Sequence, residues 1–161
     1  MELIVAVDKN WGIGKGNELL VHLPGDLKRV KEITMGHALI LGKKTLESFP
    51  GGNPLPGRPH IVLCFPDEKI DKDVIVVNSI EEAVKKASLY DRSFVFGGES
   101  VYRSMLPYCT KAYVTKIDYA FDADRFFPNL DEDESWKVKD IGETNTYNDI
   151  NYTYLIYERI K

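Results

Sequence analysis

Short apolar runs rich in valine and isoleucine recur along this chain of 161 residues, and helix-like segments stand between some of them. Continuous apolar strands that alternate with helices are typical of a mainly parallel sheet, because helices then cover both of its faces. The pattern therefore favours an α/β fold without internal repeats or linkers. The predicted strands are residues 3–7, 38–42, 60–65, 74–77 and 94–96, and the first two of them are expected to be buried.

Two later segments and several amphipathic stretches complete this expectation. Residues 111–119 and 152–159 alternate enough between apolar and polar to be half-exposed strands near an edge of the sheet. Ser79 and Glu82 match a capping box, so a helix is expected after Ser79. Further helices are expected after Pro24, over residues 43–48, and from residue 99 to Pro107, which stops the last one.

The composition excludes several classes of function. The net charge of −4 disfavours a nucleic-acid partner, which would require a basic surface. Cys64 and Cys109 have no metal-ligand spacing and the three histidines are scattered, so no metal site is expected. No run approaches the length of a membrane span, and the N-terminus is no signal peptide. We expect one domain over residues 1–161, a cytoplasmic monomer with both thiols reduced and buried.

Asp26 is the most informative single residue of the helix that starts near Pro24. Leu23, Leu27, Val30 and Thr34 form one stripe of this helix, and Asp26 lies at the edge of its apolar face. An acid in the first turn is favoured by the helix dipole alone. The alternative is a carboxylate in the wall of a pocket, tuned by burial for a ligand or a proton. The helix by itself leaves both interpretations open.

Three predicted strand ends carry residues suited to a nucleotide, at residues 42–45, 63–65 and 97–102. Ligands of such sheets bind at the carboxyl edge, where strands end and helices begin. A strand, Gly97-Gly98 and a helix form one end, and bare amides there can approach a diphosphate. Close helix–strand packing explains a glycine pair about as often, and no Walker A pattern or Ser-His-Asp arrangement is present. The residues alone thus predict a nucleotide-binding α/β domain with a pocket that includes Asp26.

Seven motifs in order then carry a resemblance that covers nearly the whole chain. They are Ile13-Gly14 with Asn17, Leu23-Pro24-x-Asp26-Leu27, Gly42-x-x-Thr45, Pro54-Leu55-Pro56-Gly57-Arg58, Gly97-Gly98-x-x-Val101-Tyr102, Thr115, and Asp124-x-x-Phe127-Pro128. Each is a loose motif, but together and at these spacings they resemble the dihydrofolate reductase family. The resemblance implies an eight-stranded, mostly parallel sheet with an antiparallel C-terminal edge strand and about four flanking helices.

The same resemblance implies a reaction and a set of site residues. NADPH would bind at the carboxyl edge and dihydrofolate in an adjoining cleft, with hydride passing to pterin C6 and a proton reaching N5 through water. Asp26 would bind the pterin, Thr115 would orient Asp26, and Arg58 would bind the α-carboxylate of the glutamate tail. Residues 10–22 would form a lid that excludes water.

The implied substrate and cofactor contacts are as follows. The substrate residues are Ile4, Val5, Ala6, Leu27, Val30, Phe49, Leu55, Arg58 and Phe96. The cofactor residues are Ala6, Ile13, Gly14, Asn17, Leu19, Gly42, Lys43, Lys44, Thr45, Leu63, Cys64, Phe65, Phe96, Gly97, Gly98, Glu99, Ser100, Val101 and Tyr102.

The chain also departs from the family pattern on the substrate side. Leu20-Val21 stands where the family usually has Pro-Trp, and Val30 replaces an aromatic on the helix of Asp26. Because an aromatic contact is worth roughly 0.5–1.5 kcal/mol beyond its area, we expect weak binding of small diaminopyrimidine antifolates. Folate should be affected less, since Arg58 and Asp26 are kept.

Further departures concern the cofactor and the lid. Lys43, Cys64, Phe65 and Ser100 stand where the family usually offers Arg and Ser or Thr to the 2′-phosphate, so the preference for NADPH over NADH is expected but relaxed. Ala123 replaces a common glycine beside the lid. Two other functions stay open: a related pyrimidine reductase of riboflavin synthesis, which Asp26 and Arg58 disfavour, and a catalytically weak nucleotide- or folate-binding protein.

Overall fold

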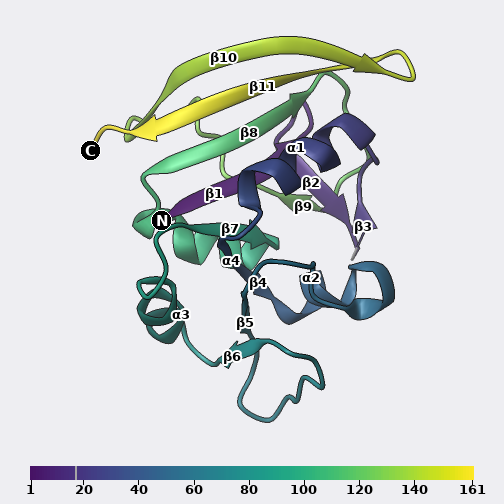
Figure 1. Ribbon diagram of the computed structural model, residues 1–161. Helices are drawn as coiled ribbons and strands as arrows, with labels where there is room; N and C mark the ends of the chain where they lie inside the picture. The colour runs from purple at the N-terminus through teal and green to yellow at the C-terminus, as the bar shows by residue number, and fades with distance from the viewer. Residues whose placement is uncertain (17) are drawn as a thin grey trace.

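An eight-stranded sheet forms the centre of the computed structural model, which describes residues 1–16 and 18–161 (Figure 1). Its strand order is β10-β11-β8-β1-β7-β4-β5-β6. All pairs from β8 to β6 are parallel, while β11 pairs antiparallel with both β8 and β10. The strands are β1 (Glu2–Val7), β4 (Ala38–Gly42), β5 (His60–Leu63), β6 (Ile75–Val77), β7 (Ser93–Gly97), β8 (Lys111–Ile117), β10 (Trp136–Tyr147) and β11 (Ile150–Arg159).

The alternation of side chains along β1 assigns two helices to each face of the sheet. Ile4 packs in one cluster with α1 (Pro24–Thr34) and α2 (Lys43–Glu47). Leu3, Val5 and Val7 point to the other face, where α3 (Ile80–Ala87) and α4 (Glu99–Met105) cover them. Two short 3-10 turns, η1 (Pro50–Gly52) and η2 (Leu106–Tyr108), follow α2 and α4. The predicted α/β fold class with four helices is confirmed.

The edge of the sheet differs from the expectation in one respect. β8 is almost fully buried between β1 and β11, so the prediction of a half-exposed strand near an edge was wrong for it. The edge is occupied by β10, which the sequence analysis missed, and the C-terminal β11 lies next to it. β10 is exposed along nearly its whole length, so its sequence has no apolar pattern to reveal it.

A small second sheet forms inside the segment predicted as a pliable glycine loop. β2 (Gly12–Lys15) pairs with β3 (Glu18–Leu19) and with β9 (Arg125–Phe126), in the order β3-β2-β9. Gly14 allows this close pairing, because a Cβ there would lie 2.8 Å from the main-chain oxygen of Glu18. The segment predicted as a lid is therefore tied to residues far along the chain.

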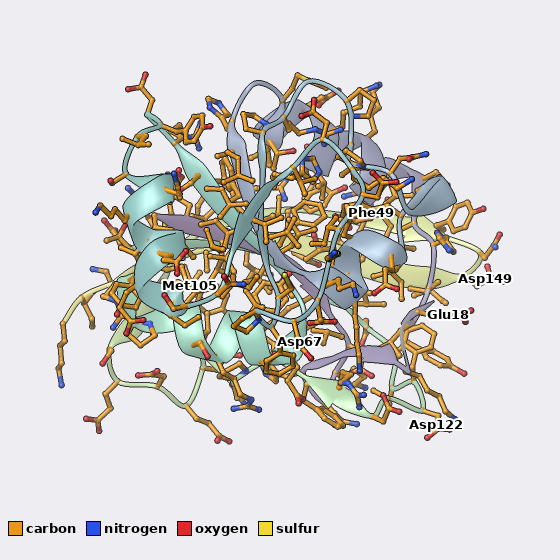
Figure 2. All side chains as sticks on the ribbon, turned by 90° about the horizontal axis from the view of Figure 1, so that it is seen from below. Glu18, Phe49, Asp67, Met105, Asp122 and Asp149 are labelled. Carbon is orange, nitrogen blue, oxygen red and sulfur yellow. The ribbon has the colours of Figure 1, made fainter. Side chains whose placement is uncertain are left out.

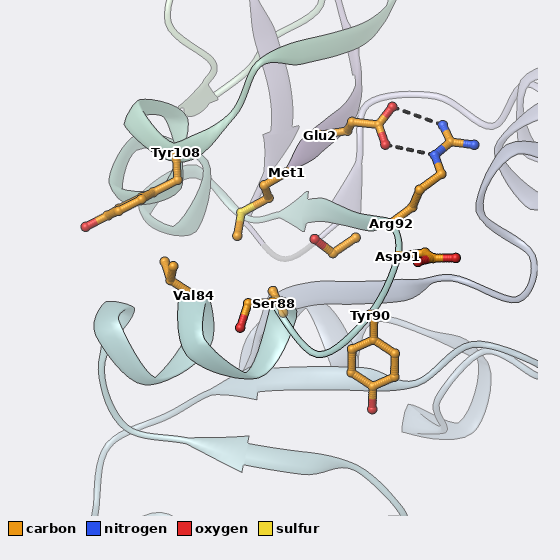
Figure 3. Close-up of a pocket in the computed structure, with 10 residues that line it drawn as sticks. Met1, Glu2, Val84, Ser88, Tyr90, Asp91, Arg92 and Tyr108 are labelled. Carbon is orange, nitrogen blue, oxygen red and sulfur yellow. Dashed lines mark hydrogen bonds and ion pairs between the residues drawn. The ribbon is translucent and has the colours of Figure 1, made fainter.

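The amino ends of β1 and β7 border an open hollow at the far end of the sheet from Asp26 (Figure 3). The carboxylate of Glu2 accepts two hydrogen bonds from Arg92 there, from Nε at 2.9 Å and from Nη2 at 3.0 Å. The hydroxyl of Tyr113 donates a third at 3.2 Å. Among the described residues, no helix is long and apolar enough to cross a membrane.

Candidate active site

Asp26 lies in the first turn of α1 and is only 8% exposed. Pro24 starts the helix, and the turn places the carboxylate against β8, where Thr115 Oγ1 donates to Asp26 Oδ1 at 2.7 Å. The hydrogen bond expected between these two residues is thus present. An acid that served only the helix dipole would need no such burial or partner. The geometry favours the second interpretation of Asp26, a carboxylate in a pocket wall.

Burial dominates the electrostatics of Asp26. It raises the pKa of the carboxyl, and the Thr115 hydrogen bond and the positive charge of Arg29 oppose it only in part. The guanidinium of Arg29 lies over the ring of Tyr154, 3.9 Å from its centroid. Among the ion pairs of residues 1–16 and 18–161, none includes Asp26. Its charge is left available for a ligand that can donate hydrogen bonds.

Apolar side chains gather beside this carboxylate on the same face of the sheet. Phe49 and Phe96 meet edge to face with ring centroids 5.9 Å apart, and Val30 and Leu55 belong to the same cluster. Leu27, by contrast, is 48% exposed. The combination of an apolar wall and one carboxylate suits a flat, polar-edged heterocycle.

The structure brings several of the predicted substrate residues together in this cluster, whereas Val5, Ala6 and the exposed Leu27 lie outside it. Ile4 belongs to the cluster of Val30 and Phe96, whereas Ala6 packs with Leu23 beside the start of α1. The side chain of Val5 points to the opposite face, into the core under α3 and α4. Val5 can therefore take part only through its main chain.

Arg58 is held rigidly at the end of the Pro-rich turn. It is 9% exposed and donates through Nε to the Pro56 carbonyl at 3.1 Å and through Nη1 to Thr34 Oγ1 at 3.2 Å. Burial lowers the pKa of its guanidinium. Thr34 in turn donates to the Val30 carbonyl at 2.7 Å, which links the arginine to α1. Such a fixed planar fork suits a carboxylate.

His60 supports this turn, and the sequence analysis missed it. Its Nε2 accepts from the Leu55 amide at 3.0 Å, and its Nδ1 lies 2.6 Å from the Arg58 carbonyl. Since Nε2 is the acceptor, Nδ1 carries the proton and donates to that carbonyl. Burial lowers the pKa of His60, in keeping with a neutral ring. The local sequence is dominated by Pro and Gly and gives no sign of this role, so only the folded chain reveals it.

Gly97 and Gly98 end β7 beside the hydroxyl of Thr45. They are joined by a cis peptide bond, and Gly97 has φ +125°. A Cβ would lie 3.6 Å from Thr45 Oγ1 at Gly97 and 3.5 Å from it at Gly98. Without side chains, the main chain and the Thr45 hydroxyl form a cradle, and the first-turn amides of α4 have no partner within the helix. These donors fit a diphosphate.

Close packing explains Gly42, another glycine at this edge. A Cβ on Gly42 would lie 3.3 Å from Val101 Cγ2, so Gly42 lets α4 approach β4. Tyr102, buried in the same helix, donates from its hydroxyl to the Ile4 carbonyl at 2.7 Å. Burial raises the pKa of Tyr102. This hydrogen bond joins α4 to the main chain of β1.

The ends of β4 and β5 lie side by side, because Gly42 pairs with Leu63. Lys43 and Lys44 follow Gly42, and Cys64 and Phe65 follow Leu63. Cys109 is fully buried as expected, but Cys64 is only half-buried at this edge, so that expectation was wrong for Cys64. Burial, aided by the nearby charge of Glu68, raises the pKa of the Cys64 thiol.

Two carboxylates anchor the lid segment and β9: Asp8, which the sequence analysis did not single out, and Glu99, which it assigned to the cofactor. Asp8, 2% exposed, accepts from the Gly12 amide at 2.8 Å and from the Phe121 amide at 3.0 Å. Glu99 Oε2 accepts from the Phe126 amide at 2.6 Å, next to an exposed Ser100. Of the predicted lid contacts, Ile13 packs onto the core, Leu19 is exposed, and Asn17 lies outside the described residues.

Comparisons with known proteins agree with this geometry. A family model described as dihydrofolate reductase matches residues 1–159. The dihydrofolate reductase of Bacillus subtilis is 38% identical over 161 residues, covering 99% of this chain and 94% of its own. That of Staphylococcus haemolyticus is 41% identical over 163 residues, covering 100% and 96%. A solved dihydrofolate reductase from Enterococcus faecalis, complexed with NADP(H) and RAB-propyl, superposes with a TM-score of 0.88 at 34% identity, covering 99% of this chain and 96% of the other.

Proposed function

The chain belongs to the dihydrofolate reductase family of NADPH-dependent oxidoreductases, and we propose how its own residues carry out dihydrofolate reduction. Bound NADPH supplies a hydride, which passes to C6 of the pterin, and N5 takes its proton from water. The buried pair of Asp26 and Thr115 beside the apolar cluster is the observation that carries this proposal.

Asp26 is proposed to bind and polarise the pterin. Its carboxylate accepts hydrogen bonds from the 2-amino group and from ring N3, and a charged acceptor makes such bonds strong. Thr115 orients the carboxylate through the 2.7 Å hydrogen bond. The negative charge raises the basicity of the pterin ring, so that water can protonate N5.

Arg58 and the apolar cluster are proposed to hold the remainder of the substrate. The fixed guanidinium binds the α-carboxylate of the glutamate tail, and its hydrogen bonds to Pro56 and Thr34 set its direction. Phe49, Leu55, Val30, Leu27, Ile4 and Phe96 line the ring system with the main chain of Val5 and Ala6. Small diaminopyrimidine inhibitors, which lack the tail, should bind weakly because Val21 and Val30 offer no aromatic face.

The cofactor is proposed to lie along the carboxyl edge of β7, β4 and β5. Thr45, Gly97 and Gly98 hold its diphosphate with the first-turn amides of α4. Residues 10–22 close over the site and exclude water during transfer. The other proposed contacts are Ile13, Gly14, Asn17, Leu19, Gly42, Lys43, Lys44, Leu63, Cys64, Phe65, Glu99, Ser100, Val101 and Tyr102.

Purified protein should consume NADPH when dihydrofolate is added. The measurement is the fall in NADPH absorbance, and Asp26→Asn should slow it by about 10²-fold or more near neutral pH because the amide carries no charge. Binding of both ligands with a flat absorbance trace in the wild type would overturn the proposal and favour the alternative of a folate-binding protein.

The chain is further proposed to act as a cytoplasmic monomer. Both cysteines are free thiols, which is common in reducing compartments. The exposed edge strand β10 has register shifts in its pairing with β11, after Val138 and after Ile141, and such irregularities disfavour edge-to-edge association. Sedimentation at increasing protein concentration tests the monomer, since a rise in apparent mass would contradict it.

A further inference from the structure

A tight turn after β5 brings a carboxylate back to the cofactor edge. Pro66 occupies the second position of this turn, which the fixed φ of proline favours, and the Glu68 amide donates to the Phe65 carbonyl at 3.0 Å. The Glu68 side chain returns to the same residue, because its Oε1 accepts from the Phe65 amide at 2.9 Å. Two hydrogen bonds to Phe65 therefore fix the position of Glu68.

Lys43 reaches this carboxylate from the neighbouring strand end. Its Nζ donates to Glu68 Oε2 at 3.0 Å, and the two side chains are partly exposed, by 28% and 32%. The Phe65 amide, with Lys43, lowers the pKa of Glu68, and the hydrogen bond to Glu68 raises the pKa of Lys43. An ammonium group and a main-chain amide that converge on one carboxylate form an anion-binding site. Glu68 itself occupies it.

The register of the sheet places this anion site near the diglycine. Gly42 pairs with Leu63, and Leu41 pairs with Gly97, so the end of β5 lies two strand spacings, about 10 Å, from the end of β7. A dinucleotide whose diphosphate lies at Gly97 and Gly98 extends its adenosine ribose across the end of β4. On this proposed placement, a substituent on the 2′ oxygen would reach Lys43 and the Phe65 amide, which follow the paired ends of β4 and β5.

We propose that Glu68 determines cofactor specificity by occupying the position of the 2′-phosphate and so bringing the affinities for NADPH and NADH close together. A phosphate dianion must displace the carboxylate and is repelled by its charge. A 2′-hydroxyl can instead donate a hydrogen bond to it, as acidic residues accept from this hydroxyl in NAD sites. The role of Glu68 rests on the proposed function, since it presumes that a nicotinamide dinucleotide binds this edge.

The neighbouring charges allow a matched control. Asp67 precedes Glu68 on the same loop, seen from below in Figure 2, and no hydrogen bond or ion pair of the described residues engages its side chain. Asp67→Asn removes the same charge as Glu68→Gln but leaves the anion site filled. A difference between these variants therefore reports occupation of the site and not the net charge of the loop.

Calorimetric titration with NADP⁺ and with NAD⁺ measures the effect without turnover. Glu68→Gln should bind NADP⁺ at least about tenfold more tightly than the wild type, because a like charge is removed from the phosphate. Its affinity for NAD⁺ should stay equal or fall, and Asp67→Asn should leave the ratio of the two affinities nearly unchanged. Binding of folate, measured in parallel, verifies that each variant is folded.

The wild type alone provides a second test. Its affinities for NADP⁺ and NAD⁺ should lie within about tenfold, and a preference for NADP⁺ above about a hundredfold would overturn the proposal. Equal effects of Glu68→Gln on both dinucleotides would overturn it as well. Failure of the wild type to bind either dinucleotide would remove the proposed function together with the role of Glu68, whereas the other outcomes concern Glu68 alone.

Discussion

Two carboxylates at opposite ends of the sheet differ in what surrounds them. Glu2, at the start of β1, accepts from Nε and Nη2 of Arg92 (Figure 3) and from the hydroxyl of Tyr113. Asp26, in α1, accepts from the neutral hydroxyl of Thr115. Burial alone would raise the pKa of Glu2, but Arg92 and Tyr113 outweigh it and lower that pKa, whereas burial prevails at Asp26 and raises its pKa.

The difference marks Glu2 as a structural charge and supports the functional role proposed for Asp26. Glu2 has its charge compensated within the fold, so the chain gains stability from keeping it ionised. Asp26 is kept at a cost to stability, since it is buried without an ion-pair partner and the charge of Arg29 offsets its desolvation only in part. Such an uncompensated group is typical of a site whose partner is a ligand. Asp26 should therefore matter for the reaction and Glu2 for the fold.

Removing each charge in turn should give opposite phenotypes. Asp26→Asn should lower kcat/KM by about 10²-fold or more and raise Tm by about 2–4 °C, the shift that roughly 1 kcal/mol produces in a domain of this size. Glu2→Gln should cost roughly 1–3 kcal/mol of stability and leave kcat/KM unchanged. Steady-state kinetics measure kcat/KM, and thermal and urea unfolding measure the stability of each variant. A loss of stability in Asp26→Asn equal to that in Glu2→Gln would contradict the comparison.

The dependence of stability on acid pH should also distinguish Glu2 from Asp26. Because the pKa of Glu2 is lowered in the folded state, its contribution is complete above its ordinary value of 4.5 and is lost as the pH falls through the folded value. The pKa of Asp26 is raised, so the folded state loses stability as the pH rises from the ordinary value of 3.8 through the folded one. Urea unfolding over this range should therefore give a shallower acid loss in Glu2→Gln and a steeper one in Asp26→Asn. Parallel curves would count against the opposite shifts.

Local features of the fold could be predicted because neighbouring residues determine them. Ser79 accepts from the Glu82 amide at 3.1 Å, as the capping box predicted. The buried strands followed from their apolar runs. β10 escaped prediction because an exposed edge strand carries no such pattern, and β8 was placed too near the edge because alternation does not reveal which strand will cover it.

Contacts between site residues that lie far apart in the sequence could not be predicted from local patterns. Asp26 and Thr115 are separated by 89 residues, and the resemblance to a family joined them where periodicity could not. His60, Asp8 and Glu68 act through turns and main-chain amides that only the folded chain brings near. Family resemblance suggests which residues meet a ligand, and the structure adds the residues that hold them.

The smallest expected effect concerns the apolar cluster beside Asp26. Val30 lies in the cluster of Phe49 and Phe96, so Val30→Phe adds an aromatic ring to the wall of the pocket. That contact is worth roughly 0.5–1.5 kcal/mol, or about 2–10-fold tighter binding of a small diaminopyrimidine inhibitor. Folate should gain less, because the charges of Asp26 and Arg58 anchor it already. Val138→Phe, on the exposed edge strand, is the control. Unchanged inhibitor affinity in Val30→Phe would show that the pocket lacks no aromatic contact, and the charge of Asp26 would then be its main determinant.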